Sequence, residues 1–362
     1  MLPTKDEIAL RRDLIDRFTT LIKKKAGAGT TVRPVGSCIT GLFFPTSDID
    51  MVMAFSSLPL SFLQSDIRRS GFASKIDSVL NASVPLLRIT DAVTGLEIDL
   101  TTSNGHGERA TNAVKKWVQE DASDDERRVI KGLVMVLKMF LSIRRLGTTY
   151  TGGINSYVLV WMVVAWVKLE MPKLQAHSST TTTAAATTTT RRSARSTDLD
   201  DIFARMNSMS ISSHTLSTAI ASTSRSSEPP TTRTNLGSAL LGFLRFYGQE
   251  FDYANKSIKF TSSSVCYASK YSYTTKIYLL SITDPADPSV DMGSKAYGIK
   301  HVRETFRDAY VTLEALIEGT ATRDQRAKAK VEGVLGCWLG GEYSQFVRER
   351  KRIIKGWKSQ RS

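Results

Sequence analysis

Asp48 and Asp50 are separated by one residue at the start of a β-prone segment, Ile49–Phe55. In an extended strand alternate side chains lie on one face, so the two carboxylates share a face while Ile49 points into the core. Mg²⁺ prefers carboxylate ligands, and two such ions ~4 Å apart can activate an attacking hydroxyl and stabilise a leaving pyrophosphate. The pair therefore predicts a two-metal site for phosphoryl or nucleotidyl transfer.

A third carboxylate, Asp99, lies in another β-prone segment, Glu97-Ile98-Asp99-Leu100. It would complete the ligands of the ion that lowers the pKa of the attacking hydroxyl, and it could help to accept the proton. Glu97 shares the strand face with Asp99 by the two-residue period and competes for this role. We expect Asp48, Asp50 and Asp99 to be both metal ligands and catalytic residues.

Gly36 and Ser37 precede this pair at a turn into a short helix. Backbone N–H groups at such a turn, together with the serine hydroxyl, can bind β- and γ-phosphates, and glycine permits a close approach. A lone D-x-D is most often an exposed pair or a helix cap, and a lone Gly-Ser is usually only a turn. The two motifs together, in this order, are much more specific.

Charge and cysteine content limit the classes of protein to which this chain can belong. Lys plus Arg exceed Asp plus Glu by 14, which fits a polyanionic partner such as RNA, DNA or a nucleotide, and also a membrane surface. Cys38, Cys266 and Cys337 form no C-x-x-C pair and no Cys/His cluster. This argues against a structural zinc site and for free thiols in a reducing compartment.

Other chemistries find no support in the sequence. The histidines do not converge with further candidate ligands, and we expect no metal role for His106, His177, His214 or His301. No Ser-His-Asp or Cys-His arrangement is visible. The amino terminus lacks a secretory signal, and the longest apolar run, Tyr157–Val167, is shorter than a membrane span. We expect a soluble intracellular protein.

The first third of the chain predicts a small mixed α/β domain. Residues 4–24 carry an apolar stripe at helical spacing, and Thr4 and Glu7 can cap that helix. Four β-prone segments follow, at Thr31–Val35, Ile49–Phe55, Leu86–Thr90 and Leu96–Thr101. The last two are joined by a turn at 91–95 and predict a hairpin.

The remainder predicts a helical domain with an insertion. Apolar helices are expected at Asp124–Leu146, Ser156–Leu169, Leu236–Tyr247 and Gly298–Ile317, with a short strand at Ser257–Phe260. Residues 176–234 are mostly Thr, Ser, Ala and Arg and hold too little apolar material for a packed core. The basic end, 348–362, interleaves Lys and Arg with apolar residues, which fits a solvated helix face with a few core contacts and an RNA-contacting tail equally well.

The resulting fold class is α+β, with a small mixed-sheet catalytic domain and a mainly helical central domain. The predicted parts are a helix at 1–25 that packs on the central domain, the catalytic domain at 26–123, the central domain at 124–175 and 235–347, a disordered insertion at 176–234 and a basic tail at 348–362.

The motifs and their order resemble the terminal nucleotidyltransferases of the DNA polymerase β superfamily. Their signature is Gly-Ser, a short helix, Ser/Thr-Asp-Ile/Leu-Asp and a later strand aspartate. Three further segments resemble the nuclear poly(A) polymerases that act with the RNA exosome: T-G-G-I-N-S-Y at 151–157, N-L-G through F-Y-G-Q-E-F-D-Y at 235–253, and D-P through D-M-G-S and A-Y-G at 284–298. The resemblance covers nearly the whole chain outside the insertion.

This resemblance implies that nucleotide binds in a cleft between the two domains, and it implies roles for residues that periodicity does not single out. Asn104 and Thr111 would contact the ribose, Lys138 the triphosphate and Ser156 a phosphate, and Tyr157 would stack under the base. A tyrosine ring does offer a face to a base, although it could equally be a core aromatic. A lysine among apolar helix residues is costly without an anionic partner, although it could reach the solvent along the surface.

The loop after Asp-Pro bears on base selectivity. Related uridylyltransferases carry a histidine there, and 287–291 of this chain contains none, which favours ATP. Polyadenylating relatives usually place Asn before the aspartate, where this chain has Val290. Asp291 is the candidate for accepting a hydrogen bond from the exocyclic amine of the base.

The resemblance implies an RNA 3′-end adenylyltransferase that uses ATP and two Mg²⁺ or Mn²⁺ ions. It also implies residence in the nucleus or nucleolus, with the cytoplasm as the alternative, and as partners a zinc-knuckle RNA-binding protein and an RNA helicase, without a membrane. The alternatives are a terminal uridylyltransferase or a small-acceptor transferase of the same fold, and an inactive adaptor. Three intact carboxylates argue against the adaptor.

Overall fold

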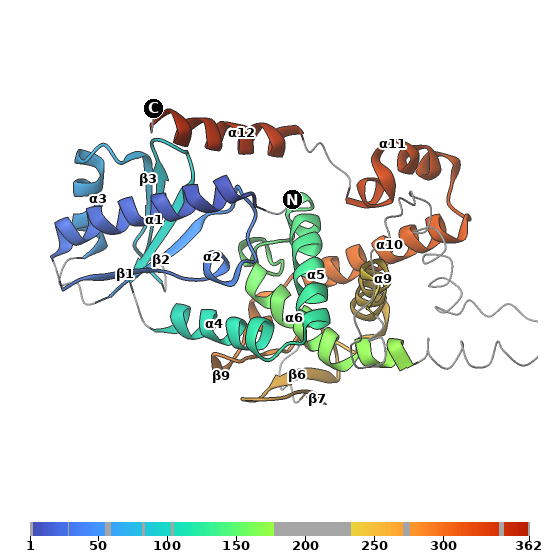
Figure 1. Cartoon of the computed structure of the whole chain (residues 1–362). Helices are drawn as coiled ribbons and strands as arrows, with labels where there is room; N and C mark the ends of the chain where they lie inside the picture. Colours follow the sequence, from blue (N-terminus) through green and yellow to red (C-terminus); the bar gives the residue numbers. More distant parts are fainter. Residues whose placement is uncertain are drawn as a thin grey trace, which may run out of the picture. The chain divides into compact units, whose positions relative to one another are not determined.

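The structure is a computed structural model, and it describes residues 3–27, 29–54, 59–81, 84–102, 105–176, 233–270, 276–339 and 344–360. Two compact units are present (Figure 1): unit 1 comprises Met1–Asp121, Pro285–Asp287 and Gly341–Ser362, and unit 2 comprises Ala122–Asp284 and Pro288–Gly340. Asn104 and most of the predicted insertion lie outside the described residues.

Unit 1 is built on a five-stranded mixed sheet in the order β1-β2-β5-β4-β3. Its elements are α1 (Lys5–Ala26), β1 (Thr31–Pro34), α2 (Ser37–Thr40), β2 (Ile49–Ala54), α3 (Leu60–Arg69), β3 (Ala73–Val79), β4 (Leu86–Asp91), β5 (Glu97–Thr102), α4 (His106–Lys115), η1 (Lys116–Glu120) and α12 (Ser344–Ser359). β2 and β5 are parallel, and the other neighbours are antiparallel. The predicted first helix, the two first strands and the hairpin are confirmed, whereas α3, β3 and α4 were not foreseen.

The first helix packs on the sheet of its own unit. α1 begins with the predicted capping box, in which Thr4 and Glu7 each bond the backbone N–H of the other. Its buried stripe consists of Leu10, Leu14, Phe18 and Ile22. These side chains share one core with apolar strand residues, among them Val32, Met51, Met53, Leu87 and Ile89. The predicted packing on the central domain is therefore wrong, because this apolar sheet face needs a helix to cover it, and α1 lies across it (Figure 1).

The basic carboxyl-terminal segment is α12, an integral part of unit 1. Ile353 and Trp357 are buried in the same core as α1. Gly356 lies against the turn between β4 and β5, where an added Cβ would stand 2.3 Å from the Val93 carbonyl oxygen. Ile353 and Trp357 are thus core contacts, and the outer, basic face of α12 remains without an assigned role.

The buried Glu7 of α1 pairs with Arg350 of α12, which donates to both of its carboxylate oxygens, at 2.7 and 2.8 Å. Burial by itself would raise the pKa of Glu7, but the hydrogen bonds from Arg350 and Thr4 outweigh it, and the pKa lies below its usual 4.5. A carboxylate whose folded-state pKa is depressed stabilises the fold above its unfolded pKa, and this contribution is lost as the pH falls through the folded value.

We therefore expect Glu7→Gln to lower the thermal midpoint at neutral pH and to flatten its fall below pH 4.5, the usual pKa of glutamate. The test compares thermal midpoints of the wild type and the variant from about pH 7 to about pH 3. Parallel curves for the two proteins across the acid range would contradict the prediction.

The remaining elements are mainly helical. They are α5 (Asp124–Ile143), η2 (Thr149–Thr151), α6 (Ser156–Leu169), α9 (Leu236–Arg245), η3 (Phe246–Glu250), β6 (Lys256–Phe260), β7 (Val265–Ser269), β8 (Thr283–Asp284), β9 (Asp287–Asp291), η4 (Met292–Lys295), α10 (Ile299–Glu318) and α11 (Arg323–Leu339). α6 coincides with its predicted range and is buried along most of its length, with Trp161 and Trp166 almost fully enclosed. Within the described part of the chain, no helix is long and apolar enough to cross a membrane. Cys38 and Cys266 are free thiols, as predicted.

Candidate metal and nucleotide site

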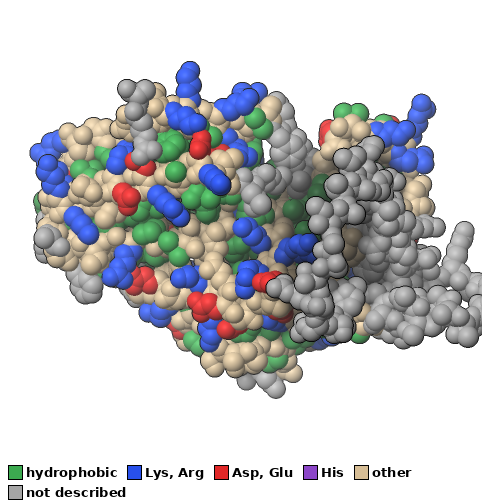
Figure 2. Space-filling model, in the orientation of Figure 1, with side chains coloured by type: hydrophobic (Ala, Val, Ile, Leu, Met, Phe, Trp, Pro, Cys, Tyr) green, Lys and Arg blue, Asp and Glu red, His purple; other side chains and the backbone are tan. Residues whose placement is uncertain are grey.

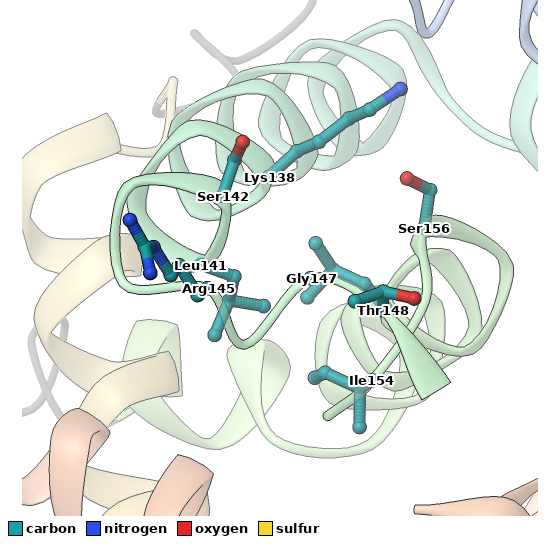
Figure 3. Close-up of a pocket in the computed structure, with 9 residues that line it drawn as sticks. Lys138, Leu141, Ser142, Arg145, Gly147, Thr148, Ile154 and Ser156 are labelled. Carbon is teal, nitrogen blue, oxygen red and sulfur yellow. The ribbon is translucent and has the colours of Figure 1, made fainter. Parts of the chain in front are cut away.

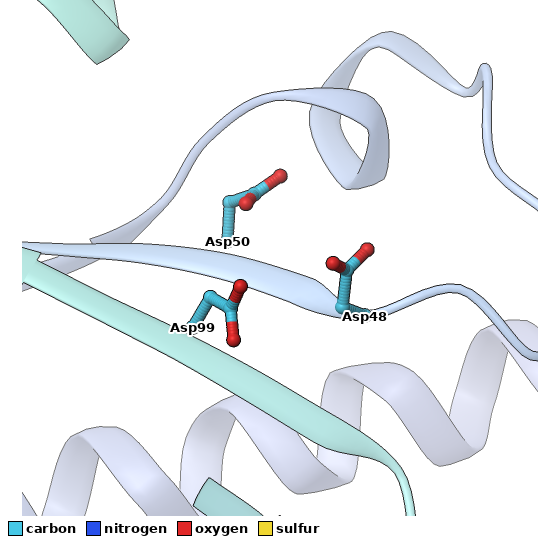
Figure 4. A group of neighbouring side chains, drawn as sticks. All are labelled: Asp48, Asp50 and Asp99. Carbon is cyan, nitrogen blue, oxygen red and sulfur yellow. The ribbon is translucent and has the colours of Figure 1, made fainter. Parts of the chain in front are cut away.

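The three predicted carboxylates converge. β2 and β5 are parallel, and their register places Asp50 opposite Asp99, with Asp48 just before β2. One carboxylate oxygen from each residue lies within 4.8 Å of the others, and Figure 4 shows the three side chains gathered at the start of β2 and on β5. Ile49 is fully buried, as the alternation predicted. Glu97 is exposed and lies outside this group, so the structure selects Asp99.

The donor set fits the predicted ions. All three ligands are carboxylates, which suit hard cations such as Mg²⁺ and Mn²⁺ and lack the imidazole or thiolate that zinc prefers. Three negative groups this close together repel one another in the absence of a cation. The cluster is therefore a candidate site for divalent ions.

Arg88, which sequence reasoning did not single out, holds the third carboxylate. Arg88 on β4 is the cross-strand neighbour of Asp99 on β5. Its Nε donates to Oδ1 of Asp99 at 2.9 Å and its Nη2 to Oδ2 at 2.8 Å. These hydrogen bonds raise the pKa of the Arg88 guanidinium. A fork-to-fork pair of this kind fixes the orientation of the carboxylate as well as its charge.

We expect Arg88→Gln to tighten Mn²⁺ binding several-fold and to lower the thermal midpoint of the metal-free protein. The substitution releases both oxygens of Asp99 but leaves the three carboxylates without the guanidinium that offsets their repulsion. Mn²⁺ titration followed by electron paramagnetic resonance and melting curves with and without Mn²⁺ test this. Arg88→Lys, which keeps the charge and loses the fork, should lie between; unchanged Mn²⁺ affinity in Arg88→Gln would refute the prediction.

The Gly36 turn is shaped by the metal site itself. Gly36 has φ of 66°, and an added Cβ would lie 2.7 Å from Oδ2 of Asp50. Its N–H donates to Oγ1 of Thr111 at 2.8 Å, and that hydroxyl donates to the Gly107 carbonyl at 2.7 Å. Ser37 is the first residue of α2, as predicted. The buried Thr111 thus holds the turn in place, and this geometry favours a positioning role over the predicted ribose contact.

Arg11 of α1 holds the segment that leads into Asp48. The side chain is 2% exposed and donates to four backbone carbonyls. The oxygens of Phe44 and Pro45 lie at 3.1 Å and that of Asp48 at 3.4 Å, and the fourth acceptor is Ser47. Burial lowers the pKa of this guanidinium. A buried cation that binds one loop at several points fixes the path of the chain into the metal site.

Sequence signals for these two arginines do exist. Arg11 interrupts the apolar stripe of the first helix, directly after Leu10 and three residues before Leu14, where a charge needs a buried partner. Arg88 lies three residues before the predicted turn at 91–95 and Asp99 four residues after it, so a hairpin brings them nearly opposite each other, and the observed register pairs them. Neither signal reveals that the partner belongs to the candidate metal site.

Two predicted phosphate ligands of unit 2 share one pocket. Lys138 on α5 and Ser156 at the start of α6 line a pocket of about 230 Å³, together with Leu141, Ser142, Arg145, Gly147, Thr148, Ile154 and Leu159. Figure 3 shows the Lys138 amine and the Ser156 hydroxyl on the same side, whereas the Arg145 guanidinium points the other way. A lysine with nearby hydroxyls is suited to bind phosphate oxygens.

Tyr157, the predicted base-stacking residue, is oriented by a buried aspartate. Its hydroxyl donates to Oδ1 of Asp284 at 2.7 Å, and Asp284 is 1% exposed. The ring meets Trp161 edge to face, with centroids 6.0 Å apart. Burial, together with the bond to Asp284, raises the pKa of the Tyr157 hydroxyl. The ring is therefore held from two sides, and its stacking role stays a prediction.

Asp291, the predicted reader of the base, is engaged as a cap. Its Oδ1 accepts from the backbone N–H groups of Ile282 and Gly293, at 3.0 and 2.9 Å, and its Oδ2 accepts from the Ser281 hydroxyl at 2.8 Å. These three bonds tie the start of η4 to the segment before β8. The geometry favours a structural role for this carboxylate.

We accordingly expect Asp291→Ala to lower the free energy of unfolding by about 1–2 kcal/mol, as for the loss of a helix cap, and to leave the preference between ATP and UTP unchanged. Urea unfolding and nucleotide competition in an extension assay measure the two effects. A changed preference at unchanged stability would restore the base-reading role.

A mixed palm sheet that carries three converging carboxylates is the fold and the site of the DNA polymerase β superfamily of nucleotidyltransferases. Two family models match the chain: residues 1–119 match "Poly(A) RNA polymerase, mitochondrial-like, central palm domain", and residues 235–290 match "Cid1 family poly A polymerase". The chain belongs to the Cid1-like family of poly(A) RNA polymerases within that superfamily.

Curated relatives are distant in sequence. Poly(A) RNA polymerase CID14 of Cryptococcus neoformans is 26% identical over 320 residues, which cover 86% of this chain and 34% of the relative. Poly(A) RNA polymerase protein 1 of Saccharomyces cerevisiae is 21% identical over 322 residues, which cover 86% of this chain and 41% of the relative. An inactive poly(A) RNA polymerase protein of Drosophila melanogaster is 25% identical over 333 residues, which cover 88% of this chain and 67% of the relative. The chain thus spans less than half the length of the first two.

Solved structures agree on the fold. The polymerase core of TRAMP, an RNA surveillance complex, superposes with a TM-score of 0.66 at 20% identity and covers 94% of this chain and 90% of its own. Cid1 in complex with the short product ApU gives a TM-score of 0.60 at 18% identity, covering 86% and 89%. Both confirm the predicted α+β class with a helical second domain.

Proposed function

We propose that the chain is a template-independent RNA 3′-terminal nucleotidyltransferase that transfers AMP from ATP to an RNA 3′-hydroxyl. The observation that carries this proposal is the convergence of Asp48, Asp50 and Asp99 in a chain of the Cid1-like family. An inactive copy has no chemical need to keep three mutually repelling carboxylates together. Their presence therefore weighs against the adaptor, although the family includes the inactive Drosophila relative.

In this reaction the RNA 3′-hydroxyl gives up its proton to water, its oxygen forms a bond to the α-phosphorus of ATP, and the bond from that phosphorus to pyrophosphate breaks. Asp48, Asp50 and Asp99 would hold two Mg²⁺ or Mn²⁺ ions, which supply hydroxyl activation and charge neutralisation. Arg88 bonds both oxygens of Asp99, which fits a role as a charged metal ligand better than the role of proton acceptor that the sequence also allows. The Ser37 hydroxyl would donate a hydrogen bond to a phosphate oxygen. The hydrogen bond between Gly36 and Thr111 holds the turn that carries Ser37 in place.

The choice of base distinguishes the two leading candidates, an adenylyltransferase that uses ATP and a uridylyltransferase that uses UTP. In unit 2, Lys138 and Ser156 would bind the triphosphate, and Tyr157 would stack on the base. The absence of histidine from 287–291 favours ATP. The specific observation in favour of UTP is Val290, which departs from the polyadenylating pattern, and solved relatives include the Cid1 poly(U) polymerase.

We further propose that the protein acts in nuclear RNA surveillance. The likeness to the polymerase core of TRAMP supports this role. A zinc-knuckle RNA-binding protein and an RNA helicase are the partners that such a role would require. Imaging of a tagged chain in its own cells, with identification of co-purified proteins, tests both points; exclusive cytoplasmic residence would overturn them.

The deciding experiment offers labelled single-stranded RNA, Mg²⁺ and each of the four NTPs separately to the purified chain. Extension with ATP, abolished by Asp48→Asn together with Asp50→Asn, is the expected result. Extension with UTP alone would establish the second candidate. If no NTP is used even after a candidate RNA-binding partner is added, a small acceptor or the adaptor role becomes the better explanation.

A further inference from the structure

One face of the carboxyl-terminal helix α12 packs against α1 and the core of unit 1. Besides the buried Ile353 and Trp357, the Trp357 Nε1 donates to Oδ2 of Asp13 on α1 at 3.3 Å. Arg350 forms its double hydrogen bond with Glu7, and Gly356 sits too close to the β4–β5 turn to admit a side chain. The rotation of α12 about its own axis is therefore set, and its outer face has a fixed position.

That outer face is strongly basic. Its exposed charged side chains are Arg348, Lys351, Arg352, Lys355 and Lys358. Glu349 is the only acidic residue of α12, and it pairs with Arg352. Lys358 pairs with Asp6 at 2.8 Å, where both side chains are more than half exposed and the solvent screens the pair. Among the residues that the structure covers, no carboxylate lies within ion-pairing distance of Lys351 or Lys355.

Three of these lysines line one shallow, open depression. Lys351, Lys355 and Lys358 line a depression of about 560 Å³, with Ile354 and Ser359 as its other walls. Figure 2 shows Lys and Arg side chains along the upper edge of this view, where Figure 1 places α12. Seven residues of helix span ~10 Å, enough to follow about three phosphates at the ~3.4 Å spacing of a stacked strand.

This face begins beside the catalytic segment. Phe346, in the first turn of α12, meets the ring of Phe44 edge to face, with centroids 6.2 Å apart. The Phe44 carbonyl is one of the acceptors that Arg11 holds on the way to Asp48. A strand bound along α12 would thus lie on the same unit as the metal site and next to the segment that carries Asp48.

We propose that the outer face of α12 binds the body of the single-stranded RNA acceptor through its phosphates, with Lys351, Lys355 and Lys358 as the contacts. This inference rests on the proposed RNA acceptor. The depression holds three cations and one half-buried isoleucine. An acidic protein or a membrane would demand more apolar contact for stable docking, whereas RNA needs cations and small apolar surfaces beside them.

The test measures RNA binding without catalysis. A fluorescent single-stranded RNA is titrated with wild-type chain, with Lys351→Gln/Lys355→Gln/Lys358→Gln, and with a matched control, Lys23→Gln/Lys24→Gln/Lys25→Gln, all in EDTA over a range of salt. The control removes the same charge from exposed lysines of the same unit, at the end of α1. Melting curves verify that each variant is folded, and the double variant Lys351→Gln/Lys355→Gln spares the Lys358–Asp6 pair.

The α12 triple variant should lose roughly tenfold or more in affinity near 0.1 M salt. Its slope of log affinity against log salt should fall by about 2, which is ~0.7 for each of three phosphates. The double variant should show about two thirds of the slope change, and the α1 control little. Equal losses in the triple variant and the control would reduce the effect to net charge and overturn the proposal, as would lost binding of anionic vesicles at unchanged RNA affinity.

The same proteins in the extension assay separate the two proposals. If the wild type binds RNA through α12 but transfers no nucleotide, the proposed function is contradicted and the proposed RNA-binding surface is supported. A wild type that extends RNA normally, with an α12 variant of unchanged affinity and salt slope, would remove the surface and leave the function. A chain that binds no RNA at all would overturn the surface.

Discussion

Replacement of Asp50 by Asn is expected to lower the rate of nucleotide transfer by roughly a thousandfold or more, with little change in stability. The space beside Asp50 is tight, since a Cβ added to Gly36 would lie 2.7 Å from Oδ2 of Asp50. Asn has nearly the same shape as Asp and therefore fits this space. The amide, however, cannot neutralise a divalent cation or share in activating the attacking hydroxyl. Single-nucleotide extension at saturating ATP, with melting curves beside it, measures both effects.

Glu97→Gln is the matched control for this substitution. Glu97 is a carboxylate on β5, exposed, and outside the group formed by Asp48, Asp50 and Asp99. We expect its loss to leave the rate within a few-fold of the wild type. Equal losses of rate in Asp50→Asn and Glu97→Gln would mean that the rate depends on the total negative charge at this end of the strands and not on a defined set of metal ligands.

Replacement of Arg11 by Met is expected to lower the free energy of unfolding by about 2–4 kcal/mol, since several buried carbonyls lose their donor together. It is also expected to reduce transfer by about a hundredfold, because a displacement near 1 Å of a catalytic group can cost that much. The carbonyls at stake belong to Phe44, Pro45, Ser47 and Asp48. Urea unfolding, Mn²⁺ affinity and extension kinetics are the three measurements.

Two further variants show whether this effect is specific. Arg12→Met removes the same charge from the neighbouring, exposed position of α1 and should leave all three measurements close to the wild type. Arg11→Lys keeps the charge but has too few donors for all four carbonyls, so it should recover part of the stability. If Arg11→Met is destabilised but retains normal Mn²⁺ affinity and rate, Arg11 supports the fold alone and does not position Asp48.

Features that depend on local periodicity could be predicted from the amino-acid sequence. The D-x-D spacing at the start of a strand was enough to place Asp48 and Asp50 on one face with Ile49 buried, because alternation is a property of any extended strand. The capping box of α1 and the range of α6 followed in the same way from short-range patterns. The family followed from the order of several motifs, each weak alone.

The residues that support that site could be identified only from contacts between distant parts of the folded chain. Arg11 meets a segment more than thirty positions away, Thr111 reaches back to Gly36, and Arg350 pairs with Glu7 across nearly the whole chain. Such contacts leave no local period, since either partner could satisfy its charge or hydrogen bond with solvent in another fold. For the same reason the predicted packing of α1 on the central domain was wrong. An apolar stripe shows that a helix packs against another element, but it does not show which element that is.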